Sequence, residues 1–193
     1  MKLLFPTVIH EIPVKNFKSI KKELVDFVYD QQQRDSSGVV FSNSGGWQSQ
    51  SVYHTYDNIL LRTIKESVIT YFKKNILLSK EIKYEGLWMN INKKGNFNLP
   101  HDHPGCNMAA VFWIKSSPRS GNIEFQSPHN FTGAAEIESY TNDFGMKTNA
   151  YSTFWINPTE GSIVMFPASL VHRVCPNEND EDRISASFNI SLL

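Results

Sequence analysis

The chain has 193 residues, and its 19 Lys and Arg side chains balance its 19 Asp and Glu side chains, so the formal net charge is zero. A neutral chain without a basic patch lacks the field that draws proteins to nucleic acid or to an anionic membrane. No apolar stretch approaches the ~20 residues of a membrane span, and Pro6 interrupts the start before a signal sequence could form, so we expect a cytoplasmic protein.

The first half of the chain predicts one short strand and two amphipathic helices. Residues 3–12 alternate weakly and predict the strand. A helix of about 16–18 residues should begin near Val14, because apolar residues then recur at helical spacing. Residues 31–46 are polar and rich in Gly and Ser, which predicts a loop. A second helix should start after Asp57 as its N-cap and end near Lys74.

From residue 80 onward, the spacing of apolar residues changes to two, which is typical of strands. The longest apolar strand is expected at Met108–Lys115, and the polar segment 129–151 is long for a connection. Short strands separated by turn signals favour an antiparallel jelly roll, mainly β with supporting helices. We expect one domain over residues 1–193, with helical support over roughly 14–79 and the β core over roughly 80–193. The remaining strands are expected at 85–92, 121–126, 152–157, 161–166, 171–174 and 183–192.

Three histidines have the spacing of metal ligands. His101 and His103 stand one residue apart, and on extended backbone such residues point to one face, while Asp102 points away. His172, from a distant strand, could complete a facial set of imidazoles, which suits Fe, Zn, Cu or Ni. The pair before Pro104 could also be a solvated turn, so the spacing alone leaves both interpretations open.

The last expected strand has two contrasting faces. An ordinary half-exposed strand would place its polar face in water. Alternatively, the polar face lines a cavity beside His172, where the planar fork of Arg183 would bind a carboxylate. We expect this second arrangement because of His172. The apolar face carries Ile184, Ala186, Phe188 and Ile190, and the polar face carries Arg183, Ser185, Ser187 and Asn189.

Five further residues have weaker signals. Trp88 and Asn90 share one face of the strand that leads to the histidine pair, so they could line the same pocket. Core packing of Trp88 and a turn contact of Asn90 explain them equally well. His10, His54 and His129 have no partner at ligand spacing, and we expect them to be structural or surface residues.

Six short motifs are spread over nearly the whole chain: LFPT at 4–7, GWQS at 46–49, WMN at 88–90, HxHPG at 101–105, FPASLxH at 166–172 and RISxSFN at 183–189. Together, these motifs resemble the 2-oxoglutarate- and Fe(II)-dependent oxygenase superfamily, and within it a small family frequent in marine bacteria and phages. The last two motifs are specific only in combination.

The resemblance implies a double-stranded β-helix core. It also implies an enzyme that oxidises a substrate, usually by hydroxylation, while it decarboxylates 2-oxoglutarate to succinate. His101 matches the first Fe(II) ligand and His172 the distal one. Arg183 with Ser185 matches the group that binds the far carboxylate of 2-oxoglutarate. His103 departs from the pattern, which has Asp or Glu there, so the metal would have no anionic protein ligand. We expect His103 to be the third ligand, with Asp102 as the less favoured substitute.

Two functions from other classes stay open. A three-histidine dioxygenase of the cupin type would need a metal and oxygen but would form no succinate. A non-catalytic β-barrel module would bind metal structurally or not at all. Arg183 and Ser185 favour the oxoglutarate enzyme, whereas His103 favours the alternatives. The substrate, a small molecule or a peptidyl group, stays open, and helix-backed barrels of this kind often form homodimers.

Overall fold

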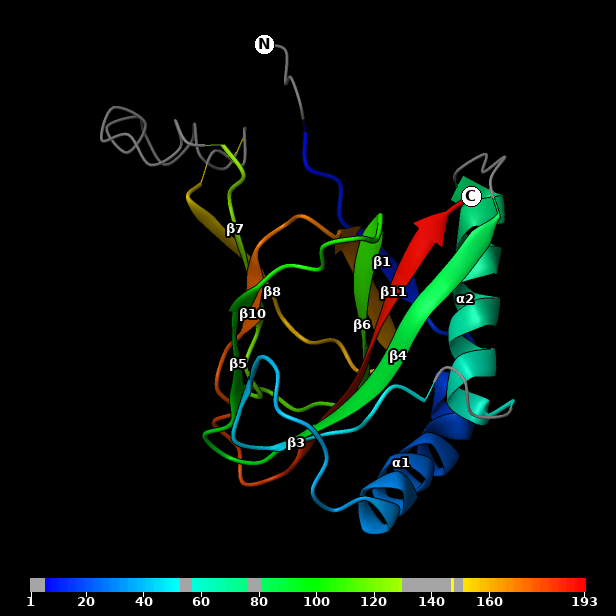
Figure 1. The fold of residues 1–193 in the computed structure, drawn as a ribbon, viewed down its shortest axis with the longest axis vertical. Coiled ribbons are helices and arrows are strands. Elements are labelled where there is room, and N and C mark those ends of the chain that lie inside the picture. The colour runs from blue at the N-terminus through cyan, green and yellow to red at the C-terminus, as the bar shows by residue number, and fades with distance from the viewer. Residues whose placement is uncertain (1–5, 53–56, 76–80, 130–146, 148–150) are drawn as a thin grey trace.

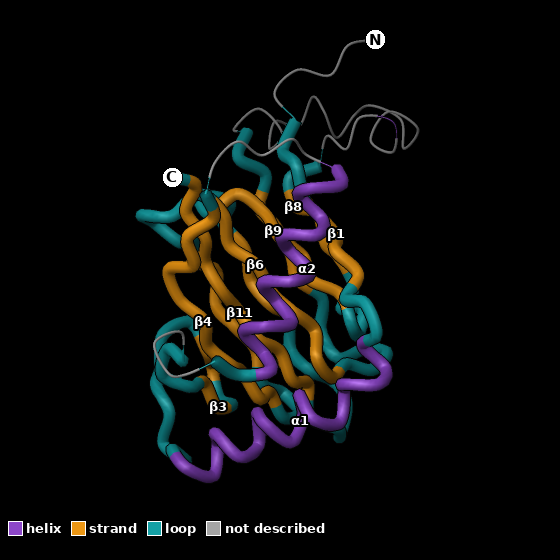
Figure 2. Tube along the Cα trace, turned by 90° about the vertical axis from the view of Figure 1, so that its right-hand side faces the viewer, coloured by secondary structure: helices purple, strands orange, loops and turns teal. Residues whose placement is uncertain are grey.

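Two antiparallel sheets face each other, and two helices cover the outer face of the larger sheet (Figures 1 and 2). This arrangement is seen in a computed structural model, which describes residues 6–52, 57–75, 81–129, 147 and 151–193. The larger sheet has the strand order β1-β9-β6-β11-β4-β3, and the smaller has the order β2-β5-β10-β7-β8. The expected architecture, mainly β with supporting helices, is confirmed.

The elements have the following bounds. The helices are α1 (Phe17–Arg34) and α2 (Ile59–Asn75). The larger sheet contains β1 (His10–Pro13), β3 (Trp47–Gln48), β4 (Ile82–Asn92), β6 (Met108–Lys115), β9 (Ser162–Pro167) and β11 (Arg183–Leu192). The smaller sheet contains β2 (Asn43–Ser44), β5 (Phe97–His101), β7 (Ile123–Gln126), β8 (Thr153–Ile156) and β10 (His172–Val174).

The outer face of the larger sheet forms the main core together with the helices. Residues of β11 and of both helices belong to one buried cluster. Each large apolar side chain that is fully buried stabilises the fold by about 1.5–3 kcal/mol. This gain decides which face of β11 is turned toward the helices. Its apolar face is turned toward the helices, so its polar face lies between the sheets, as expected. The cluster includes Leu24, Val28, Leu60, Ile64, Phe112, Ile184, Ala186 and Phe188.

The space between the sheets is divided into an apolar and a polar part. A second buried cluster, including Val111, Trp113, Phe125 and Phe166, fills the apolar part. Polar side chains of β4 and β11 face β5 and β10 in the other part, which holds a cavity. Jelly rolls of this size have room for a ligand only where the interior is left unfilled.

Most expected strands are confirmed, including Met108–Lys115 and the whole of β11. The sequence did not predict β5, because its alternation is broken at Leu99 and Pro100, which are both exposed. The first strand is shorter than expected, and it pairs with β9. Residues 3–5 and most of the polar segment 129–151 lie outside the described residues.

Both helices are confirmed, with corrections at their starts. Helix α1 begins later than expected because β1 extends to Pro13, and it continues to Arg34, into the expected loop. Helix α2 is capped by Asn58 instead of Asp57: the Leu61 N–H donates to Asn58 Oδ1 at 2.8 Å. Neither helix has the apolar length that crossing a bilayer requires.

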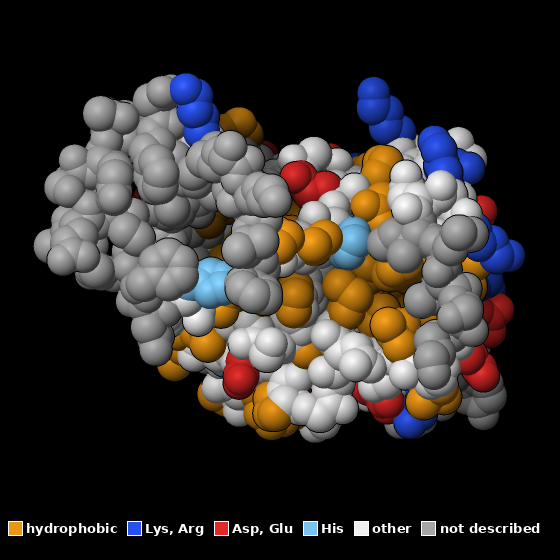
Figure 3. All heavy atoms as spheres, turned by 90° about the horizontal axis from the view of Figure 1, so that it is seen from above, with side chains coloured by type: hydrophobic (Ala, Val, Ile, Leu, Met, Phe, Trp, Pro, Cys, Tyr) orange, Lys and Arg blue, Asp and Glu red, His pale blue; other side chains and the backbone are white. Residues whose placement is uncertain are grey.

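On the face seen from above, the described side chains differ in their placement by type. Hydrophobic side chains occupy the middle of this face, and Lys, Arg, Asp and Glu side chains lie mostly along its margin (Figure 3).

The cap of α2 can be tested with adjacent substitutions. Asn58→Ala should lower the free energy of unfolding by about 1 kcal/mol, because the Leu61 N–H loses its acceptor. Asp57→Ala removes only an exposed pair with Arg62 and should cost at most ~0.5 kcal/mol. Urea unfolding measures both, and a larger loss for Asp57→Ala would contradict the assignment.

Candidate active site

A bulge in β5 turns His101 into the cavity. His172 on β10 lies opposite His101, and Val174 lies opposite Asn98, so β5 has one more residue between the pairs than β10. An extra residue of this kind lets two side chains that would alternate share one face. His101 and Asn98 therefore both line the cavity.

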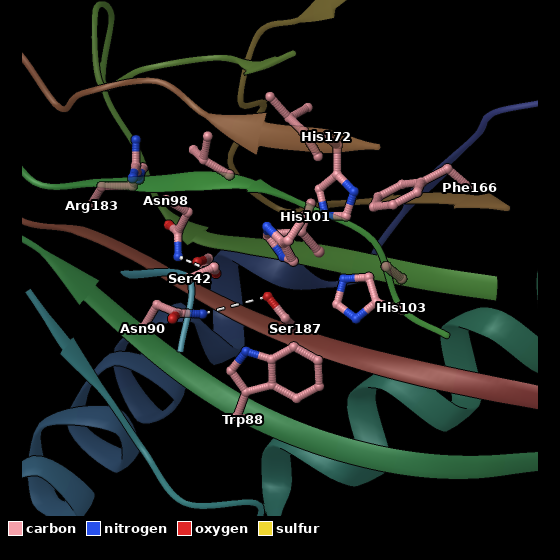
Figure 4. A pocket seen from close by; sticks show the side chains of 15 residues that line it. Ser42, Trp88, Asn90, Asn98, His101, His103, Phe166, His172, Arg183 and Ser187 are labelled. Carbon is pink, nitrogen blue, oxygen red and sulfur yellow. Dashed lines mark hydrogen bonds between the residues drawn. The ribbon is translucent and has the colours of Figure 1, made fainter. Parts of the chain in front are cut away.

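The three predicted histidines converge (Figure 4). The candidate ligand nitrogens of His101, His103 and His172 all lie within 4.8 Å of one another. The backbone differs from the expectation, because β5 ends at His101 and His103 lies in the following turn. The backbone N–H of His103 donates to the backbone carbonyl oxygen of Ala168 at 2.9 Å. Ala168 lies in the connection between β9 and β10, so this bond holds the turn next to the strand that carries His172. Asp102 is exposed and does not belong to the group.

Backbone carbonyls orient two of the three rings. His101 Nδ1 lies 2.7 Å from the Leu99 carbonyl oxygen, and His172 Nδ1 lies 2.9 Å from the Leu170 carbonyl oxygen. A carbonyl oxygen only accepts hydrogen bonds, so each Nδ1 carries the proton and each Nε2 keeps a free lone pair. Metal-binding histidines usually have such an outer hydrogen bond.

Burial favours the neutral form of His103 and His172. It lowers the pKa of His172 to about 3, and it lowers the pKa of His103 to about 4, with repulsion from the charge of His101 as a smaller cause. A neutral imidazole binds a metal ion without first losing a proton. Zinc–nitrogen bonds of about 2.0–2.1 Å place two ligands of one ion at most ~4 Å apart, so this group fits a metal ion after small ring rotations.

Arg183, the first residue of β11, is 1% exposed and lines the same cavity. Its Nη1 donates to the carbonyl oxygens of Ser120 and Cys175, while its Nε and Nη2 are buried and have no hydrogen-bond partner among the described residues. Burial lowers the pKa of Arg183 to about 10, so the guanidinium stays charged near pH 7. Nε and Nη2 form the edge that binds a carboxylate through two hydrogen bonds.

Gly121 makes the approach of Arg183 possible. Its φ is +85°, and a Cβ at this position would lie 2.6 Å from Arg183 Nη1 and 2.2 Å from the Cys175 carbonyl oxygen. Only glycine combines this backbone angle with so close a contact. Gly121 thus supports the orientation of the guanidinium.

The cavity extends from Arg183 to the histidines and has a volume of about 450 Å³, part of it open to solvent (Figure 4). Asn90 pairs with Ser185, and Trp88 pairs with Ser187, across β4 and β11. The cavity is lined by Ser42, Trp88, Asn90, Asn98, His101, His103, Ala110, Val111, Ile123, Phe166, His172, Val174, Arg183, Ser185 and Ser187.

The structure brings Trp88, Asn90, Arg183 and Ser185 to one cavity with the three histidines. His172 and Arg183 line this cavity from different sheets, because β10 and β11 do not pair with each other. Sequence reasoning missed Ser42, which lies beside the two-residue strand β2, and Asn98, which lies in the bulged strand β5. It also missed Ser120 and Gly121, which lie in the connection between β6 and β7.

The other histidines lie apart from this group. His10 Nδ1 is 3.2 Å from the Tyr71 hydroxyl of α2, as expected for a structural residue. His54 lies outside the described residues. His129 follows β7 and is not a member of the metal-ligand group.

A family model described as "Putative 2OG-Fe(II) oxygenase" matches residues 86–189, more than half of the chain. The match begins in β4 and ends in β11, so it includes the three histidines, Arg183 and Ser185. No curated protein matches the chain in sequence.

Solved oxygenase structures are similar to this chain in fold. A prolyl-4-hydroxylase of Pseudomonas putida has a TM-score of 0.65 at 11% identity, covering 96% of this chain and 92% of that one. The viral collagen prolyl hydroxylase vCPH from Paramecium bursaria Chlorella virus-1, solved with 2OG, has a TM-score of 0.60 at 13% identity, covering 94% of each chain. HygX from Streptomyces hygroscopicus, solved with nickel, 2-oxoglutarate and hygromycin B, has a TM-score of 0.66 at 9% identity, covering 96% and 83%. Such low identities establish the double-stranded β-helix fold alone.

Gly121→Ala should destabilise the protein more than Gly95→Ala, its matched control. Both glycines have a similar positive φ, +85° and +82°. An alanine at either position is strained in this left-handed conformation, so both variants should lose ~1–2 kcal/mol of stability. A Cβ at Gly95 meets no atom within 4 Å, whereas the clash at Gly121 should cost roughly 1–3 kcal/mol more. Denaturant unfolding gives the difference, and equal losses would refute the close approach to Arg183.

Proposed function

The chain belongs to the 2OG-Fe(II) oxygenase family, and from that premise we propose that it hydroxylates an organic substrate while 2-oxoglutarate is decarboxylated to succinate. Its enzyme class is that of the 2-oxoglutarate-dependent non-haem iron oxygenases, and its cofactors are Fe(II) and 2-oxoglutarate. The observation that carries the proposal is the free Nε and Nη2 edge of Arg183 in the cavity of the three histidines.

His101, His103 and His172 would hold the iron through ring nitrogens. When bound, iron supplies the activation of oxygen that oxidative decarboxylation and substrate oxidation require. The Leu99 and Leu170 carbonyls fix the direction of two rings, so these ligands are oriented before the metal arrives. The ligand set differs from the superfamily pattern at His103, which is neutral where an acidic residue is usual.

Arg183 would bind the far carboxylate of 2-oxoglutarate, with Ser185 beside it as a hydroxyl donor. The Ser120 and Cys175 carbonyls hold the guanidinium in place, so the pair would form without reordering a long side chain. Phe166 packs against His172 with ring centroids 4.5 Å apart and excludes water from that side of the ligand. The substrate would enter beside Trp88, whose ring lies 5.8 Å from that of His103.

Arg183→Ala should weaken the binding of 2-oxoglutarate by roughly 2–5 kcal/mol, or about 30- to 4000-fold, because a buried charged pair is lost. Calorimetry with the Mn(II)-loaded protein measures this change. Arg173→Ala is the control, since Arg173 is exposed and pairs with Glu124 at 2.8 Å. Unchanged affinity in Arg183→Ala would remove Arg183 from this role.

His172→Ala should abolish succinate formation from 2-oxoglutarate in the presence of Fe(II) and oxygen. It should also weaken Mn(II) binding by more than the ~10–100-fold that loss of an outer hydrogen bond costs. His10→Ala removes an imidazole outside the cavity and should change neither quantity. Oxygen consumption without succinate in the unmodified protein would instead favour the three-histidine dioxygenase.

A further inference from the structure

The walls of the cavity carry no negative charge. Among the described residues that line it, none is Asp or Glu. An imidazole that binds a metal through a ring nitrogen contributes no charge, and the acidic residue nearest to the histidines in the chain, Asp102, is exposed. A divalent metal at the histidines would therefore meet dipoles but no opposite charge of the protein.

Arg183 adds a positive charge to the same cavity. Its contacts are neutral carbonyl oxygens, and within the described part of the chain it forms no ion pair. Figure 4 shows Arg183 at one end of the cavity and the histidines toward the other. Charges of the same sign inside a protein cavity repel one another more strongly than charges on the surface, because the protein walls screen them less than bulk water does.

The charge of Arg183 and the lack of an acidic residue in the lining together oppose metal binding when 2-oxoglutarate is not bound. A bound divalent ion adds about two positive charges to the one of Arg183, and imidazole ligands add none, so the cavity would carry about three positive charges. A dicarboxylate offsets two of these charges, one at the metal and one at the guanidinium. An acidic residue at position 103 would have supplied part of this charge permanently.

We infer that the metal and 2-oxoglutarate bind to this protein as a unit, each weakly without the other, because His103 and Arg183 leave the cavity without a counter-charge. This inference rests on the proposed function. The coupling is reciprocal: the factor by which 2-oxoglutarate tightens metal binding equals the factor by which the metal tightens 2-oxoglutarate binding. Metal loading of the protein therefore follows the concentration of 2-oxoglutarate.

Titration of the full-length, metal-free protein with Mn(II) tests the inference without any turnover. We expect the Kd for Mn(II) to fall at least tenfold when 2-oxoglutarate is saturating, as measured by electron paramagnetic resonance of free Mn(II). Calorimetry with 2-oxoglutarate, with and without Mn(II), should return the same factor. Glutarate, which has both carboxylates but no keto group, separates charge compensation from chelation and should give a smaller tightening.

Two variants isolate the roles of charge. His103→Asp should bind Mn(II) at least tenfold more tightly than His103→Asn in the absence of 2-oxoglutarate, since the two differ mainly in charge. The tightening by 2-oxoglutarate should be smaller in His103→Asp than in the unmodified protein. Arg183→Ala should bind Mn(II) alone several-fold more tightly than the unmodified protein, although it loses 2-oxoglutarate. A residue with a merely structural role would not improve metal binding when it is removed.

The outcomes distinguish the inference from the proposed function. If 2-oxoglutarate binds to the Mn(II)-loaded protein but leaves the Kd for Mn(II) within twofold, the inference is overturned and the proposed function stands. Unchanged Mn(II) binding in Arg183→Ala, with equal affinities in His103→Asp and His103→Asn, also overturns it. If 2-oxoglutarate does not bind even at saturating Mn(II), the proposed function itself fails.

Discussion

The bulged pairing of β5 with β10 is the contact on which the geometry of this site depends. It places His101 opposite His172 and also directs Asn98 into the cavity. Without the extra residue, the alternation of β5 would send one of these two side chains to the outer face. Leu99 lies within the bulged segment, and its carbonyl oxygen lies 2.7 Å from His101 Nδ1, so this segment also orients the ring of a metal ligand.

The helices determine the rest of the site from the opposite side of the larger sheet. Because Ile184, Ala186 and Phe188 are buried against them, the alternate residues of β11 must face the second sheet. This places Arg183 and Ser185 inside the barrel, where a guanidinium would otherwise be unfavourable. The stability gained under the helices thus supports a polar cavity that contributes little stability of its own.

Arg183 illustrates how the fold retains a buried cation. Carbonyl oxygens of two loops accept the hydrogen bonds of Nη1, and Gly121 leaves the room for this approach. Within the described part of the chain, the donors on the opposite edge have no hydrogen-bond partner, which is costly in a folded interior. A bound carboxylate would remove this cost, so the energy of burying Arg183 is linked to the affinity for an acid.

The sequence by itself determined the fold class, both helices, most strands, the two faces of β11 and the histidines and Arg183 as candidate site residues. These features depend on local periodicity and on residue chemistry, which are visible in a single chain. Only the tertiary structure decided the strand β5, the cap at Asn58 and the separation of His172 and Arg183 onto different sheets. It also decided the close contact of Gly121 with Arg183. Bulges, sheet order and close approaches depend on the partner strand or loop, and that partner is distant in sequence.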